Sequence, residues 1–234
     1  MRNPLKDKLK KTILYSLLER MRELSFFARA MRKGSFSQNE EDLSIVHYFS
    51  SKVGRYIDVG ANHPFVISNT YLLYRKGWSG ITIDPLPRQH KAHRFWRPRD
   101  VALNIGIGER KGSLRLFQFI PDKYSTFDSK RAEDLVRLGG TLRGNIEVPV
   151  LTLADVLQSY GRKLGNVDLL CVDAEGMDLQ VLRGNDWGLF QPTLILCETP
   201  RDQASREELL GFLGTKGYTD IKTTHFNTFF EWRG

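Results

Sequence analysis

The chain has 234 residues, 41% of them hydrophobic, which is enough to bury one substantial core. It has two cysteines and no apolar run near the roughly 20 residues that span a bilayer. This excludes a disulfide framework, a cysteine zinc site and a transmembrane helix, and it is typical of a cytoplasmic protein. The net charge is +8, but residues 1–34 carry +7 of it, so we expect no nucleic-acid partner for the rest of the chain.

The first predicted element is a helix over residues 5–31, where apolar side chains recur at spacings of mostly three and four. Lysine and arginine occupy much of its other face. We therefore expect a basic amphipathic extension, residues 1–34, and one main domain, residues 35–234. Residues 5–33 could make a peripheral contact with the anionic inner face of a membrane. The alternative is a helix packed on the domain or on a second copy of the chain in a homo-oligomer.

The next elements alternate between helices and strands. Gly34 ends the first helix, and the Ser37-Gln38-Asn39-Glu40 stretch has the spacing of a capping box, which predicts a helix over residues 38–49. Short apolar runs then alternate with helix-length segments. This order predicts a Rossmann-like α/β fold with a mostly parallel sheet and helices on both faces. The expected strands are residues 55–61, 80–84, 101–107, 167–173 and 193–198.

The second half of the chain departs from this order. Residues 113–120 alternate in polarity and are expected to pair with the preceding strand as a hairpin across residues 108–112. The polar residues 122–144 predict a flexible segment over the ligand site. The remaining expected elements are a strand at residues 148–151, a helix to Tyr160 capped by Thr152 and Asp155, and a terminal antiparallel hairpin of residues 217–224 and 227–232.

The loops after the strands carry the candidate site, because ligands of an open parallel sheet bind at the carboxyl ends of its strands. After the first strand, Gly60 permits a close backbone approach, and Asp58 and Asn62 offer hydrogen bonds. The fingerprint GxGxxG would need glycine where Asn62 and Phe65 stand, so a nicotinamide oxidoreductase is disfavoured. A ligand without phosphate, such as S-adenosylmethionine, suits this loop better.

Acidic residues also end three later strands. Asp84 ends the second strand, where a carboxylate can accept both hydroxyls of a ribose; the alternative is a turn residue before Pro85. Asp173 and Glu198 end the fourth and fifth strands. We expect these two carboxylates to lie side by side at the mouth of the sheet.

Ordered motifs between residues 37 and 184 resemble the FkbM-type methyltransferases. They are Ser37-Gln38 with Glu41-Asp42, the run from Tyr56 to Asn62, Ser68-Asn69-Thr70, the run from Gly77 to Ile81 leading to Asp84, Asn104 with Gly106, residues 148–153, and Asp173-Ala174-Glu175-Gly176 followed by Val181-Leu182-Arg183-Gly184. The Asp-x-Glu-Gly element is the most specific of them. His63-Pro64 stands where many members have Ile-Gly, and residues 1–34 have no counterpart.

The resemblance implies a class I methyltransferase domain that uses S-adenosylmethionine for O-methylation. We expect the acceptor to be a hydroxyl of a sugar, a glycan or a related polar small molecule. The expected cofactor-binding residues are Asp58, Gly60, Asn62, Asp84 and Asn104. The alternative function is a non-catalytic Rossmann-like binding module, tethered to a membrane or to a glycan-assembly complex.

Asp173, Glu198 and His63 are the expected residues of the transfer site. One carboxylate could act as base, both could bind a divalent cation such as Mg²⁺, or both could hold sugar hydroxyls. His63 titrates near neutrality and could be the base, or it could fix the loop backbone. Glu175 could instead belong to a helix start, so it ranks below Asp173. A further charged run could bind a charged substrate or form a solvated cluster: Arg97, Arg99 and Asp100.

Overall fold

The computed structural model describes residue 18, residues 21–50 and residues 52–234. Its main sheet has the strand order β3-β2-β1-β7-β8-β10-β9, in which β10 pairs antiparallel with both β8 and β9 and the other pairs are parallel. The expected Rossmann-like α/β fold and the terminal hairpin are therefore confirmed. The strands of this sheet are β1 (Arg55–Val59), β2 (Ser79–Ile83), β3 (Val101–Leu103), β7 (Leu169–Val172), β8 (Leu194–Glu198), β9 (Tyr218–Thr223) and β10 (Asn227–Trp232).

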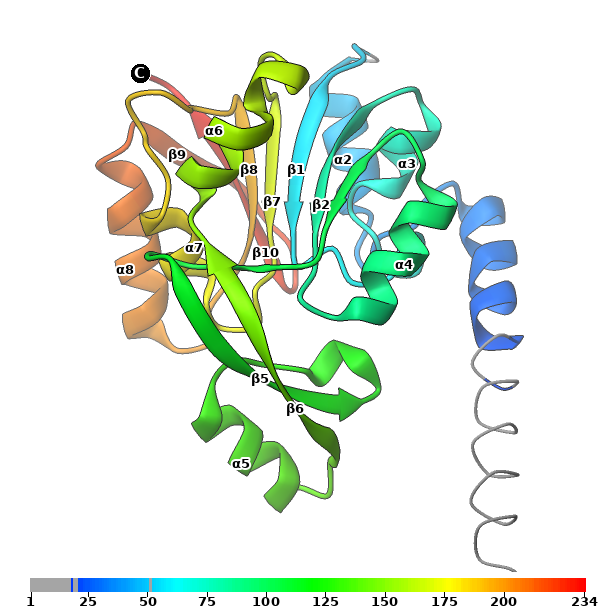
Figure 1. Ribbon diagram of the computed structural model, residues 1–234. Coiled ribbons are helices and arrows are strands. Elements are labelled where there is room, and N and C mark those ends of the chain that lie inside the picture. The colour runs from blue at the N-terminus through cyan, green and yellow to red at the C-terminus, as the bar shows by residue number, and fades with distance from the viewer. Residues whose placement is uncertain (1–17, 19–20, 51) are drawn as a thin grey trace, which may run out of the picture.

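Helices cover both faces of this sheet, as Figure 1 shows, because successive side chains of its central strands are apolar on both sides. On β1, Tyr56 packs in a cluster with residues of α2 and α3. The next residue, Ile57, packs in the opposite cluster with residues of α6, α7 and α8. The helices are α2 (Glu41–Tyr48), α3 (Tyr71–Arg75), α4 (Pro87–Trp96), α5 (Ser129–Arg137), α6 (Leu153–Leu164), α7 (Asp178–Arg183) and α8 (Gln203–Gly214).

A second, three-stranded sheet lies beyond one end of the main sheet (Figure 1). It contains β4 (Gly106–Ile107), β5 (Gly112–Ile120) and β6 (Thr141–Leu151), in the order β4-β6-β5. The expected strand at residues 101–107 is thus divided between two sheets, and the expected hairpin is wrong, because β5 pairs antiparallel with β6. The segment expected to be flexible is largely ordered, since it contains a 3-10 turn (Asp122–Tyr124), α5 and the start of β6.

The two expected capping boxes have different outcomes. The box at Thr152 and Asp155 is confirmed, with both reciprocal hydrogen bonds present at the start of α6. The box at Ser37 is wrong: α2 begins at Glu41, and no side chain caps it. Buried Asp42 instead accepts hydrogen bonds from the hydroxyls of Ser35 and Ser37. The Ser37 side chain therefore stabilises the segment before α2 and does not cap the helix.

Residues 21–33 are helical and pack against the domain. Phe27 meets the ring of Phe65 edge to face at 5.4 Å, and Ala30 is buried beside Phe36 and Leu72. The expected helix also includes residues 5–17, 19 and 20, which lie outside the described residues. Among the residues that the structure describes, no helix is long and apolar enough to cross a membrane.

Candidate active site

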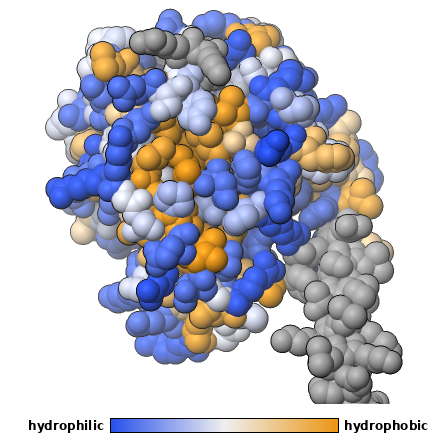
Figure 2. Space-filling model, viewed as in Figure 1, coloured by the Kyte–Doolittle hydropathy of each residue, from blue (hydrophilic) through white to orange (hydrophobic). Residues whose placement is uncertain are grey.

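A cavity of about 840 Å³ opens at the carboxyl ends of β1, β2 and β7. The strand order reverses between β1 and β7, and this is the place where such sheets bind ligands. Residues 58–62, 83–86 and 173–175 form the floor, and residues of the second sheet and of the helix 21–33 form further walls. On the face shown in Figure 2, hydrophobic side chains gather near the middle of the domain and hydrophilic ones surround them.

The loop after β1 has a backbone shape that few residues adopt. Gly60 has φ 77° and Asn62 has φ 44°, both in the left-handed region. A Cβ on Gly60 would lie 1.7 Å from the carbonyl oxygen of Asp173. The backbone of Gly60 therefore packs closely against the loop after β7, and it also lines the cavity. His93, which is buried under the loop, places Nε2 2.9 Å from the carbonyl oxygen of Asn62.

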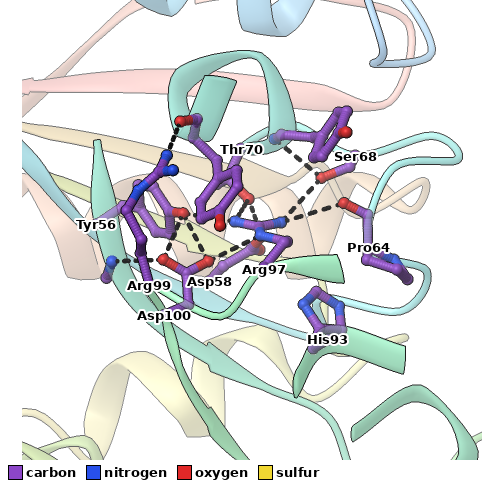
Figure 3. Close-up of polar contacts among 12 residues, drawn as sticks. Tyr56, Asp58, Pro64, Ser68, Thr70, His93, Arg97, Arg99 and Asp100 are labelled. Carbon is purple, nitrogen blue, oxygen red and sulfur yellow. Dashed lines mark hydrogen bonds and ion pairs between the residues drawn. The ribbon is translucent and has the colours of Figure 1, made fainter. Parts of the chain in front are cut away.

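Asp58 belongs to a buried ionic network, drawn in Figure 3. Its carboxylate accepts a hydrogen bond from Thr70, whose hydroxyl also accepts one from Arg97 at 2.9 Å. Arg97 donates to Asp100 at 2.8 Å and to the hydroxyl of Tyr56 at 2.7 Å. Burial raises the pKa of Asp58, and the charge of Arg97 opposes that shift.

Two roles were expected for the charged run before β3, and neither holds for Arg97 or Asp100. Arg99 is exposed and donates a hydrogen bond to the backbone carbonyl of Tyr74. The side chains of Arg97 and Asp100 are fully buried, so they form no solvated cluster. Neither residue lines the cavity. They tie β1 to β2, since both contact the hydroxyl of Tyr56 on β1 and Asp100 also accepts a hydrogen bond from the backbone N–H of Gly80 on β2.

Asp84 is buried at the cavity floor and its carboxylate is already engaged by backbone. One oxygen accepts from the N–H of Asn62 and the other from the N–H of Leu86, both at 2.8 Å. The hydrogen bond from Leu86 is typical of a turn residue, which is the alternative role expected for Asp84. Each oxygen keeps a second acceptor site, which leaves capacity for a ligand as well. Burial raises the pKa of Asp84 to about 7, and the backbone hydrogen bonds oppose the shift.

Asn104 does not line the cavity. Its side-chain amide donates to the backbone carbonyl of Asp84 at 2.9 Å. Its observed contact therefore positions Asp84, and direct contact with a cofactor stays a prediction.

Asp173 lies just after β7, where it lines the open cavity and is exposed to solvent. Loss of solvation raises its pKa well above the usual range, and the nearby charges of Glu198 and Glu175 raise it further. Glu198 is half-buried and is not among the cavity-lining residues, although its charge acts on Asp173. The expected pair is thus close enough to interact, but only Asp173 reaches the cavity.

The loop after Asp173 is held by two contacts that the sequence did not indicate. Asp178 accepts hydrogen bonds from the backbone N–H groups of Ala174, at 2.9 Å, and Gly176. Glu175, at φ 52°, forms an ion pair with Arg131 of α5. Burial raises the pKa of Glu175 to about 7, and the charge of Arg131 opposes that shift. Glu175 lies before α7 rather than in it, and it lines the cavity.

His63 lines the cavity, but its ring is engaged. Nδ1 accepts from the backbone N–H groups of Phe65, at 3.3 Å, and Val66, at 3.1 Å, and Nε2 lies 3.4 Å from a carboxylate oxygen of Glu23. Burial lowers the pKa of His63 to about 4, with a smaller effect from the charge of Arg88. These contacts match the alternative in which His63 fixes the loop backbone.

Residues 121–123 and 125–127, which follow β5, line the cavity, whereas Tyr124 does not. Within residues 18, 21–50 and 52–234, no group of three or more histidine, cysteine, aspartate or glutamate side chains is arranged to hold a metal ion. The cavity lining thus combines carboxylates, cationic side chains, hydroxyls and apolar side chains.

Comparisons with known proteins point to one family. Residues 58–231 match the methyltransferase FkbM domain. The chain is 29% identical to "Methyltransferase sdnD" of Sordaria araneosa over 141 residues, which cover 50% of this chain and 53% of that protein. The chain thus spans about half the length of the curated relative that it matches.

Similar solved structures include an O-methyltransferase from Bacillus cereus in complex with SAH, at 13% identity and a TM-score of 0.45, covering 92% of this chain and 89% of that one. The C-terminal domain of precorrin-6Y C5,15-methyltransferase from Rhodobacter capsulatus is 13% identical, with a TM-score of 0.38, and covers 80% of this chain and 83% of that one.

Proposed function

Because this chain belongs to the FkbM family of methyltransferases, we propose that it transfers a methyl group from S-adenosylmethionine to a hydroxyl oxygen of a sugar, a glycan or a related polar small molecule. The observation that carries the proposal is the position of three carboxylates, those of Asp58, Asp84 and Asp173, on the floor of one cavity at the switch point of the sheet. S-adenosylmethionine has a cationic sulfonium and a ribose, and both suit an acidic floor.

The floor has the size and the acceptors that this cofactor needs. A volume of about 840 Å³ lies near the upper end of the usual range for small-molecule sites, which leaves room for an acceptor beside the cofactor. Asp84 would hold the ribose through its remaining acceptor sites, and Asn104 would keep Asp84 in position. Gly60 and Asn62 would bring backbone close to the amino-acid end of the cofactor, with Asp58 beneath it.

S-adenosylmethionine supplies a methyl carbon that is already activated by the sulfonium. The hydroxyl oxygen of the acceptor forms a bond to this carbon as the carbon–sulfur bond breaks, which leaves S-adenosylhomocysteine. Asp173 takes the hydroxyl proton in its carboxylate form, because it reaches the cavity and the neighbouring charges of Glu198 and Glu175 favour proton uptake by that carboxylate. Glu198 supports Asp173 by raising that pKa.

Four other predicted features are not needed for this proposal. His63 is a poor base, since its Nδ1 lone pair is engaged by two backbone N–H groups, and we assign it to the loop. A divalent cation at Asp173 and Glu198 is a separate hypothesis, tested by adding Mg²⁺. Contact with a membrane and homo-oligomer formation through the N-terminal segment also stay predictions.

Isothermal titration calorimetry with S-adenosylmethionine and S-adenosylhomocysteine, each with and without Mg²⁺, tests the proposal. Micromolar binding supports it and justifies a screen of glycoside acceptors by methyl transfer. Absence of binding in every condition would instead favour the non-catalytic module.

A further inference from the structure

The cavity has walls of opposite charge. The floor presents the carboxylates described above, whereas the outer wall presents Arg22 and Arg29 of the helix 21–33, Arg88 of α4 and Lys123. An acidic floor suits a cationic cofactor. The outer wall lies where an acceptor would enter, so its charge bears on what that acceptor is.

One face of the helix 21–33 is directed at the cavity. Arg22, Phe26 and Arg29 are spaced four and three residues apart, which places them on one side of a helix, and all three line the cavity. Phe27 and Ala30 lie on the adjacent side and pack on the domain, which fixes the helix at this angle. This segment lies before residues 58–231, the part of the chain that matches the family.

The acidic groups of the outer wall are already engaged by protein cations. Glu23 lies 3.9 Å from the guanidinium of Arg88, and Nε2 of the neutral His63 ring lies 3.4 Å from the same carboxylate. Asp122 lies 3.6 Å from Arg88 and 3.6 Å from Arg143. By contrast, Arg22 and Arg29 have no carboxylate partner in the part of the chain that the structure describes; Arg29 donates only to the backbone carbonyl of Ser25.

From this arrangement we infer that the acceptor carries a phosphate group, which Arg22 and Arg29 bind beside the bound cofactor. The inference rests on the proposed function and specifies its substrate class. Arg22 and Arg29 stand two helical turns apart, about 10 Å along the axis, so their long side chains can reach a dianion that lies between them. The planar guanidinium also donates paired hydrogen bonds that match phosphate oxygens. Lys123 is a further cation of the cavity lining, and its charge acts on Glu175.

The test uses the full chain and its double variant Arg22→Gln with Arg29→Gln. A matched control variant, Arg32→Gln with Arg206→Gln, removes the same charge at exposed positions that do not line the cavity. Each protein, saturated with S-adenosylhomocysteine, is titrated with pyrophosphate and with acetate. We expect the wild type and the control to bind pyrophosphate more tightly than acetate, and the double variant to bind pyrophosphate about tenfold more weakly or worse.

Equal pyrophosphate binding by the double variant, an equal loss in the control, or equal affinity for acetate would overturn the inference. S-adenosylhomocysteine affinity is measured for all three proteins and should stay within about twofold of the wild type, since neither arginine lies on the cofactor floor. If S-adenosylhomocysteine does not bind the wild type, the proposed function itself fails. Vesicles containing phosphatidylglycerol distinguish the source of the phosphate: Arg22-dependent and Arg29-dependent binding to them indicates a lipid-linked acceptor, and its absence alongside pyrophosphate binding indicates a soluble one.

Discussion

Replacing Gly60 with alanine should damage both the fold and the cofactor site. Any L-residue at φ 77° costs about 1–2 kcal/mol. The new Cβ would also lie 1.7 Å from the carbonyl oxygen of Asp173, so the loops after β1 and β7 must separate by more than an ångström to relieve the contact. Overpacking of this kind costs about 1–3 kcal/mol more, because the clash is with backbone and no side-chain rotation removes it.

Gly34 provides a matched control for this substitution. Its φ is 76°, but a Cβ there would meet nothing within 4 Å. In urea unfolding, Gly34→Ala should lose only the backbone cost, about 1–2 kcal/mol, and Gly60→Ala about 2–5 kcal/mol. Gly60→Ala alone should also lose S-adenosylhomocysteine binding. Equal free energies of unfolding for the two variants, with binding retained, would refute this account of the β1 loop.

Three further predictions concern the titrating and buried groups. Affinity for S-adenosylhomocysteine should fall by up to about tenfold per pH unit below about pH 7, because Asp84 becomes protonated there and loses acceptor capacity. The variant Asp84→Asn should bind weakly, and its affinity should depend less on pH. A wild-type affinity that does not change with pH would contradict the ribose role of Asp84. Arg97→Met should lower the free energy of unfolding by about 3–5 kcal/mol, since it leaves buried carboxylates without a cation; near-wild-type stability in urea would show that the network is dispensable. Arg131→Gln should change stability by less than about 1 kcal/mol, because the pair with Glu175 is partly exposed, yet it should speed amide hydrogen exchange in α5. Unchanged exchange would mean that the pair does not hold α5 against the loop after β7.

The sequence predicted the main sheet well because its evidence is local. Strands buried on both faces read as continuous apolar runs, and the acidic or glycine residue that ends each run marks the ligand edge. For this reason the strand ends alone predict that Asp58, Gly60, Asp84 and Asp173 come together, and in the structure all four line one cavity. Pairing between distant segments could not be predicted in this way. β5 alternates as a strand should, but nothing in its residues indicates that its partner is β6 rather than the strand before it.

Residues that act through tertiary contacts were also missed. Arg97 looks like a surface arginine in sequence, yet it is fully buried, because Asp100, Tyr56 and Thr70 surround its guanidinium in the folded chain. His93 is a second example, since it lies four residues after Gln89 on the buried side of α4. A buried position is normally indicated in sequence by an apolar residue, and neither Arg97 nor His93 is apolar.

A crystal structure of the protein with S-adenosylhomocysteine tests the central claim most directly. The account predicts the ligand in the cavity at the ends of β1, β2 and β7, with its ribose hydroxyls within hydrogen-bonding distance of Asp84 and its amino-acid end beside residues 58–62. A ligand bound elsewhere on the protein, or bound in this cavity with its ribose away from Asp84, would contradict it.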